Sequence, residues 1–76
     1  MKEFVEFIAR HLVDNPDRII LELEEKDDKM VFRLTVAEAD VGKVIGRQGR
    51  TAQAIRVLLA AVAAREGKRA LLEIVD

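Results

Sequence analysis

One short segment of the chain combines glycines, cations and an amide in a pattern suited to binding phosphate. Gly46 and Gly49 stand three positions apart, and glycine, lacking Cβ, allows another backbone to come close. Arg47 and Arg50 add positive charge beside them, and Gln48 is a neutral hydrogen-bonding neighbour. A helix beginning directly after Gly49 would contribute free N–H groups and the positive end of its dipole. The pattern therefore predicts a loop that clamps a phosphate chain.

The net charge of −1 conceals an uneven distribution of charge along the chain. Residues 1–40 contain six Lys or Arg and eleven Asp or Glu, whereas residues 41–69 contain seven Lys or Arg and a single acid, Glu66. Phosphate binding depends on the local field, which decays over about 8 Å at physiological salt. The positive region coincides with the two glycines, which strengthens the prediction. Cations near residues 65–69 can equally serve only to complement a helix dipole.

Length and composition exclude several functional classes. A chain of 76 residues makes one small domain without room for a deep enzyme cleft. It has no cysteine for a disulfide or a thiolate zinc site. Its single histidine, His11, is expected near the end of a helix, where a surface role is the common one. The glycine spacing fits neither a P-loop nor a dinucleotide fingerprint. We therefore expect no enzyme, no cofactor and no metal site.

The N-terminal segment indicates neither a secretory signal nor a membrane span. Glu3, Glu6 and Arg10 interrupt its apolar residues, whereas a signal peptide or a span requires an uninterrupted apolar stretch. We expect a cytoplasmic protein with no membrane association.

The first half of the chain reads as a helix followed by a β-hairpin. Helical spacing of apolar residues predicts a helix from Lys2 to Asp14, ended by the Asn15-Pro16-Asp17 segment. Two alternating runs follow it, joined by a turn over residues 26–29. The residues expected to face the core are Phe4, Phe7, Ile8 and Leu12 on the helix, and Ile19, Leu21, Leu23, Met30, Phe32, Leu34 and Val36 on the strands.

The second half predicts a short helix over residues 40–45 with Asp40 as its N-cap, a long helix from Arg50 to Glu66, and a strand from Ala70 to Val75. The order is then α-β-β-α-α-β. A crossover of two helices favours parallel pairing between the second and third strands. The sequence therefore predicts an α+β, two-layer fold in which all helices cover one face of a mixed three-stranded sheet.

The long helix carries two apolar faces. Ile55, Leu58, Leu59 and Val62 form the expected core face, and a second stripe lies roughly opposite. We expect this stripe to pack on the N-terminal helix of the same chain, with a subunit interface as the alternative. Its residues are Ala54, Val57, Ala61 and Ala64.

The stretch from Val41 to Thr51, VGKVIGRQGRT, together with Ile55, resembles the signature of a KH domain. The element order resembles the type II, prokaryotic version of that domain. The resemblance spans residues 1–76 as a single domain, and the chain is similar to the small bacterial single-KH proteins of the KhpA type.

The resemblance implies a non-catalytic RNA-binding protein, of the kind that acts as an RNA chaperone or post-transcriptional regulator. KH domains bind about four nucleotides of single-stranded RNA, with the G-x-x-G loop clamping the backbone. Here the loop would be Gly46–Gly49, flanked by Lys43 and Arg50, while an apolar groove for the bases would be lined by Val41, Val44 and Ile45. The resemblance further implies a homodimer, or a heterodimer with a larger KH-containing RNA-binding protein.

The chain has no Tyr or Trp, and its three Phe match core positions, so aromatic stacking platforms are not expected.

Two alternatives stay open at this point. The residues fit RNA and single-stranded DNA alike. The rival function is a protein-interaction module, in which the glycine loop is only a tight turn between helices.

Overall fold

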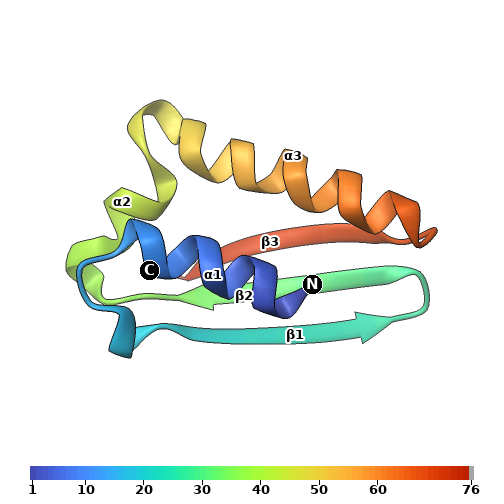
Figure 1. Cartoon of the computed structure of the whole chain (residues 1–76), viewed down its shortest axis with the longest axis horizontal. Helices are drawn as coiled ribbons and strands as arrows, with labels where there is room; N and C mark the ends of the chain where they lie inside the picture. Colours follow the sequence, from blue (N-terminus) through green and yellow to red (C-terminus); the bar gives the residue numbers. More distant parts are fainter. Residues whose placement is uncertain (76) are drawn as a thin grey trace.

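The computed structural model describes residues 1–75 and consists of a three-stranded sheet with its helices on one face (Figure 1). The predicted α-β-β-α-α-β order is confirmed, with three short 3₁₀ helices added between the main elements. The elements are α1 (Lys2–Leu12), η1 (Pro16–Arg18), β1 (Ile20–Lys26), β2 (Lys29–Thr35), η2 (Glu38–Asp40), α2 (Val41–Ile45), η3 (Arg47–Gly49), α3 (Arg50–Arg65) and β3 (Arg69–Val75).

Strand β2 is the centre of the sheet, as predicted. It pairs antiparallel with β1, where Leu23 lies opposite Phe32, and parallel with β3, where Phe32 lies opposite Leu72. The antiparallel pair needs only a two-residue turn, in which Asp27 takes a φ of 56°. The parallel pair needs a long crossover, which α2 and α3 provide. This crossover carries the glycine loop to one end of the sheet (Figure 1).

The core lies between the sheet and the helical layer, but α1 contributes a different face from the one predicted. Val5 and Ala9 are its buried residues, and they are four positions apart on one side of the helix. Phe7 lies on the far side and keeps 62% of its surface exposed, and Phe4 is exposed as well. Only Phe32 is a core aromatic residue. The prediction that all three Phe are buried is therefore wrong for the two on α1.

Helix α3 also differs from the prediction in the residues that face the sheet. Its buried row is Ala52, Ile55, Leu59 and Ala63. Leu58, predicted to be in the core, is 49% exposed. The second stripe, Ala54, Val57, Ala61 and Ala64, is exposed throughout. The prediction that this stripe packs on the N-terminal helix is therefore wrong, and α3 presents a largely apolar outer surface.

No helix within residues 1–75 covers the opposite face of the sheet (Figure 1). At its centre Arg33 forms ion pairs with Glu73 at 3.2 Å and with Glu24 at 3.8 Å, and both carboxylates are exposed to solvent. Over residues 1–75 no helix combines the length and apolar character needed to cross a membrane.

Candidate nucleic-acid interface

The glycine loop is a tight reversal of the chain between α2 and α3. Gly46 leaves α2 with φ 78° and ψ 171°, and Gln48 and Gly49 both take left-handed backbone angles, with φ of 58° and 74°. Two hydrogen bonds hold the turn: the Gly46 N–H donates to the carbonyl oxygen of Gly42 at 2.9 Å, and the Gly49 N–H donates to that of Gly46 at 3.1 Å. The loop therefore has a defined backbone shape before any ligand arrives.

The two glycines meet different requirements. A Cβ built on Gly46 would lie 2.6 Å from the Cβ of Thr51 and 2.8 Å from its backbone N, closer than real Cβ atoms come. A Cβ built on Gly49 would meet nothing within 4 Å. Gly46 thus lets the loop fold against the first turn of α3. Gly49 supplies a positive φ at a place where the backbone is open to a partner.

The structure brings together the side chains that the sequence predicted for phosphate contact. Arg47, Gln48 and Arg50 are all exposed. Among residues 1–75, neither Arg47 nor Arg50 forms an ion pair. Helix α3 begins after Gly49 without a side-chain cap, and its dipole adds to the positive potential. The N–H groups of Gly49 and Arg50 already donate to carbonyl oxygens within the loop, so an anion placed here would meet mainly the guanidinium groups and the helix dipole.

Lys43 is engaged differently from the prediction. Its Nζ lies 2.9 Å from Oδ2 of Asp14 and 3.8 Å from Oδ1 of Asp40. The hydrogen bond to Asp14 and the charges of both carboxylates raise the pKa of Lys43, despite partial desolvation. Its charge is thus shared with two acids of the same chain. We expect a weaker phosphate contact from Lys43 than from Arg47.

Asp40 anchors α2 to the segment that follows α1. The side chain is fully buried. Its carboxylate accepts hydrogen bonds from the backbone N–H of Asp14 at 3.2 Å, and from the backbone and side-chain N–H of Asn15 at 3.0 Å each. Burial acts to raise the pKa of Asp40, but these hydrogen bonds and the charge of Lys43 outweigh it and lower the pKa. Asp40 is the N-cap residue of α2, as predicted, but its side chain makes no cap hydrogen bond to that helix.

The predicted apolar groove is only partly exposed. Val41 and Ile45 are half-buried and keep some surface beside the loop. Val44 is fully buried, so it supports α2 from beneath, which corrects the prediction that its side chain lines a groove. Sequence reasoning missed Arg56, whose guanidinium donates to the carbonyl oxygen of Leu72 on β3 at 3.3 and 3.4 Å. One sequence signal pointed to Arg56, its place among the cations of residues 41–69.

Comparison with known proteins places these features in a family. The family model described as KhpA/KhpB, KH domain, matches residues 2–74. A protein named RNA-binding protein KhpA from Chlamydia trachomatis is 43% identical over 76 residues, covering all of this chain and 97% of the relative. The protein of that name from Borreliella burgdorferi is 47% identical over 74 residues, covering 97% and 90%. The one from Listeria monocytogenes is 41% identical over the full length of both chains. No solved structure matches the chain.

Proposed function

Because the chain belongs to the KhpA/KhpB family of KH domains, we propose that it is a non-catalytic protein that binds short segments of single-stranded RNA. The observation that carries the proposal is the geometry of the Gly46–Gly49 loop. The loop presents an open backbone at Gly49 and two arginines that pair with no acid among residues 1–75, at the start of α3, which has no side-chain cap. The names of the relatives, each an RNA-binding protein, support RNA as the polymer.

In the proposed mode, the RNA backbone passes over Gly49, where no side chain stands in the way. Arg47 and Arg50 form charge-assisted hydrogen bonds with phosphate oxygens, and the counterions released make binding dependent on salt. The bases lie toward the exposed parts of Val41 and Ile45. Asp40 keeps α2, and with it the loop, fixed to the rest of the molecule, so little ordering is required when RNA binds.

We also propose for this chain the cellular role that the KH resemblance implies. A site for about four nucleotides with few sequence contacts fits a cytoplasmic RNA chaperone or post-transcriptional regulator. Modest affinity of one domain would be raised by joining two domains in a dimer, because the second contact is then intramolecular.

Amide chemical shifts during a titration with a mixed-sequence RNA hexamer test the proposal. We expect the largest shifts at residues 46–51 and smaller ones along α2. The matched control is the same sequence as a duplex, which hides the base edges and should bind much more weakly. Shifts confined to the outer surface of α3, or equal binding of the duplex, would contradict the proposed site.

A second candidate function is self-association, or pairing with another KH protein, through the outer surface of α3. Val57 is 58% exposed there and Leu58 is 49% exposed. They are accompanied by Ala54, Ala61 and Ala64, whose small side chains let another helix approach closely. Exposed apolar surface of this kind is typical of a protein interface. The family name covers both KhpA and KhpB, which favours a second KH domain as the partner. RNA binding and pairing use separate surfaces and are compatible.

A further inference from the structure

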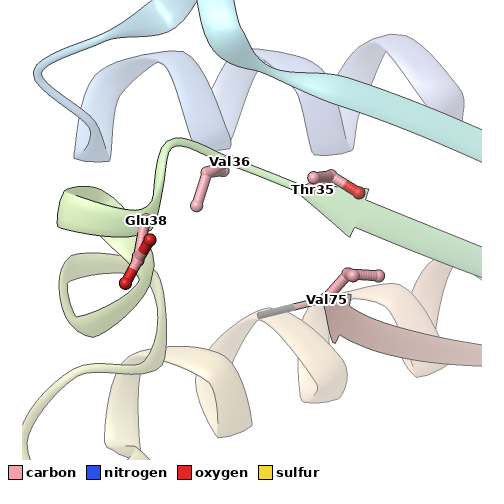
Figure 2. Close-up of a pocket in the computed structure, with 4 residues that line it drawn as sticks. All are labelled: Thr35, Val36, Glu38 and Val75. Atoms are coloured by element: carbon pink, nitrogen blue, oxygen red, sulfur yellow. The ribbon is translucent and has the colours of Figure 1, made fainter.

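Two hollows on the surface of the protein differ in their lining. The one where β2 and β3 end is bordered by side chains without an aromatic ring, as Figure 2 shows: Thr35, Val36, Glu38 and Val75. The other, of about 220 Å³, lies on α1 and has an aromatic ring among its four residues: Glu3, Glu6, Phe7 and Arg10. Of the two, the hollow on α1 is the one that offers a flat apolar surface to a ligand.

The ring of Phe7 points away from the core. Val5 and Ala9 are the buried residues of α1, and Phe7 lies on the other side of the helix. It keeps 62% of its surface exposed, the largest fraction among the large apolar side chains of residues 1–75. An aromatic ring in this position leaves apolar area that a ligand can cover. The chain therefore does have an exposed aromatic surface, contrary to the expectation from the sequence.

His11 supports the Phe7 ring from one side. Its Nδ1 lies 2.9 Å from the carbonyl oxygen of Phe7, and because a carbonyl oxygen only accepts, Nδ1 is the donor. The two ring centroids are 4.4 Å apart, with the ring planes at 48°. At 100° per residue, His11 lies about 40° from Phe7 around the helix axis, and the other residues of the hollow lie about 40–100° in the opposite direction. His11 thus leaves the side toward the hollow open.

The carboxylates beside the ring face cations of the same chain. Glu3 Oε2 lies 3.7 Å from the amino group of Met1, and Glu6 Oε1 lies 3.4 Å from Nη2 of Arg10. These pairs reduce the repulsion that two free carboxylates would exert on the phosphates of a nearby strand. The hollow is therefore suited to a neutral, flat group carried by a polyanion, which is the chemistry of a nucleobase.

The hollow on α1 lies within reach of an RNA strand held at the glycine loop. Lys43 Nζ and Asp14 Oδ2, 2.9 Å apart, join α2 to the segment after α1. The path from Phe7 to Gly46 through this contact extends over at most roughly 30 Å. A stacked strand advances 3.4 Å per nucleotide, so roughly nine nucleotides cover the path in addition to about four held at the loop. A hexadecamer can therefore contact both places, whereas a tetramer held at the loop cannot.

We propose that the Phe7 ring, supported by His11, is a stacking platform for one base of an RNA strand whose neighbouring nucleotides are clamped at the glycine loop. The proposal rests on the proposed RNA binding and adds a second contact to it. Aromatic side chains bind the bases of single strands by stacking, and every base has a π-face, so the contact tolerates any sequence. The platform therefore lengthens the bound segment without adding a strong base preference.

The variant Phe7→Trp reports stacking directly, because the parent chain contains no Trp and a stacked base quenches indole fluorescence. We expect quenching on titration with a mixed-sequence RNA hexadecamer and none with a tetramer. The matched control is Leu71→Trp on β3. Leu71 is 47% exposed and precedes the buried Leu72, so it points to the face of the sheet opposite α1. The fluorescence of this control should change with neither strand.

Affinities measured by fluorescence anisotropy of labelled RNA complete the test. Phe7→Ala should bind the hexadecamer at least about fivefold more weakly than the parent, the lower end of what one stacked base contributes. It should bind the tetramer as the parent does. Circular dichroism checks that the fold is retained, as expected for a change at an exposed side chain.

The outcomes separate this inference from the proposed function. If the hexadecamer binds without quenching Phe7→Trp, or binds Phe7→Ala as tightly as the parent, the platform is overturned while RNA binding stands. Loss of self-association in Phe7→Ala with unchanged RNA affinity would assign the ring to a protein contact and overturn the platform as well. A parent that binds neither strand would overturn the proposed function and the platform together.

Discussion

Replacing each loop glycine by alanine separates two reasons for having glycine there. Gly46→Ala and Gly49→Ala add the same methyl group at similar backbone φ, 78° and 74°. They differ in surroundings, because the Gly46 methyl would press on the backbone N and side chain of Thr51, whereas the Gly49 methyl would meet open space. We expect Gly46→Ala to destabilise the protein far more than Gly49→Ala.

The magnitudes follow from these surroundings. A left-handed conformation costs alanine about 1 kcal/mol, and this is the whole expected cost at Gly49. Gly46 also has ψ 171°, a combination that is essentially restricted to glycine and costs other residues about 1–3 kcal/mol. Moving the backbone of Thr51 adds about 1–3 kcal/mol of overpacking. The expected loss is therefore about 3 kcal/mol or more at Gly46, and the melting temperatures of the two variants should differ by roughly 8–16 °C.

Urea denaturation followed by circular dichroism measures both losses, with the parent protein as reference. RNA affinity of Gly49→Ala, measured well below its melting temperature, should fall modestly because its methyl group stands where the RNA backbone passes. Equal free energies of unfolding for the two variants would refute the close approach of Gly46 to α3 as the reason for this glycine.

Two further predictions concern the anchor of α2 and the outer surface of α3. Asp40→Asn should be less stable than the parent at pH 7, and the difference should shrink as the pH falls through the lowered pKa of Asp40, because only the ionised carboxylate makes this contribution. If the difference in unfolding free energy between the parent and Asp40→Asn stays constant with pH, the ionised carboxylate is not the source of the stabilisation. Ala61→Glu should remain folded and be a monomer. The exposed position accepts a charged side chain in the monomer, whereas a dimer interface on α3 would bury the carboxylate. Sedimentation showing a monomeric parent at high concentration would remove the α3 interface.

The fold could be predicted from the sequence because the spacing of apolar residues clearly distinguished the helices from the strands. Alternation in β2 identified Phe32 and Leu34 as core residues, and both are buried. The prediction of buried faces on the helices was less successful. On α1 and α3 several apolar residues lie at neighbouring positions around the helix axis. The large side chains of Phe7 and Leu58 were therefore predicted to be in the core, in place of the smaller residues that pack on the sheet. Alanines can lie closer to a sheet than large side chains, and hydrophobicity alone does not indicate this.

The loop itself was predictable, whereas its supporting contacts were not. Glycine spacing and the charge of Arg47 are local features, so the sequence displays them directly. The contact of Asp40 with Asn15 joins residues 25 positions apart, and Arg56 reaches Leu72 across 16 positions. Such pairings depend on the tertiary arrangement.

RNA binding by a variant with its loop charge reversed tests the central claim most directly. Arg47→Asp with Gln48→Asp changes the charge by three units at exposed positions, and aspartate tolerates the left-handed backbone of Gln48 better than most residues. Stability should change by no more than about 0.5 kcal/mol per site. The control, Arg18→Asp in η1 with Lys26→Ala at the end of β1, makes the same change of charge away from the loop.

We predict that the loop variant keeps the circular dichroism and melting temperature of the parent, binds single-stranded RNA at least tenfold more weakly at low salt, and loses affinity less steeply as salt rises. The control should retain most of the affinity and the salt dependence of the parent. A folded loop variant that binds RNA as tightly as the parent across the salt series would contradict the phosphate clamp and favour the interaction module.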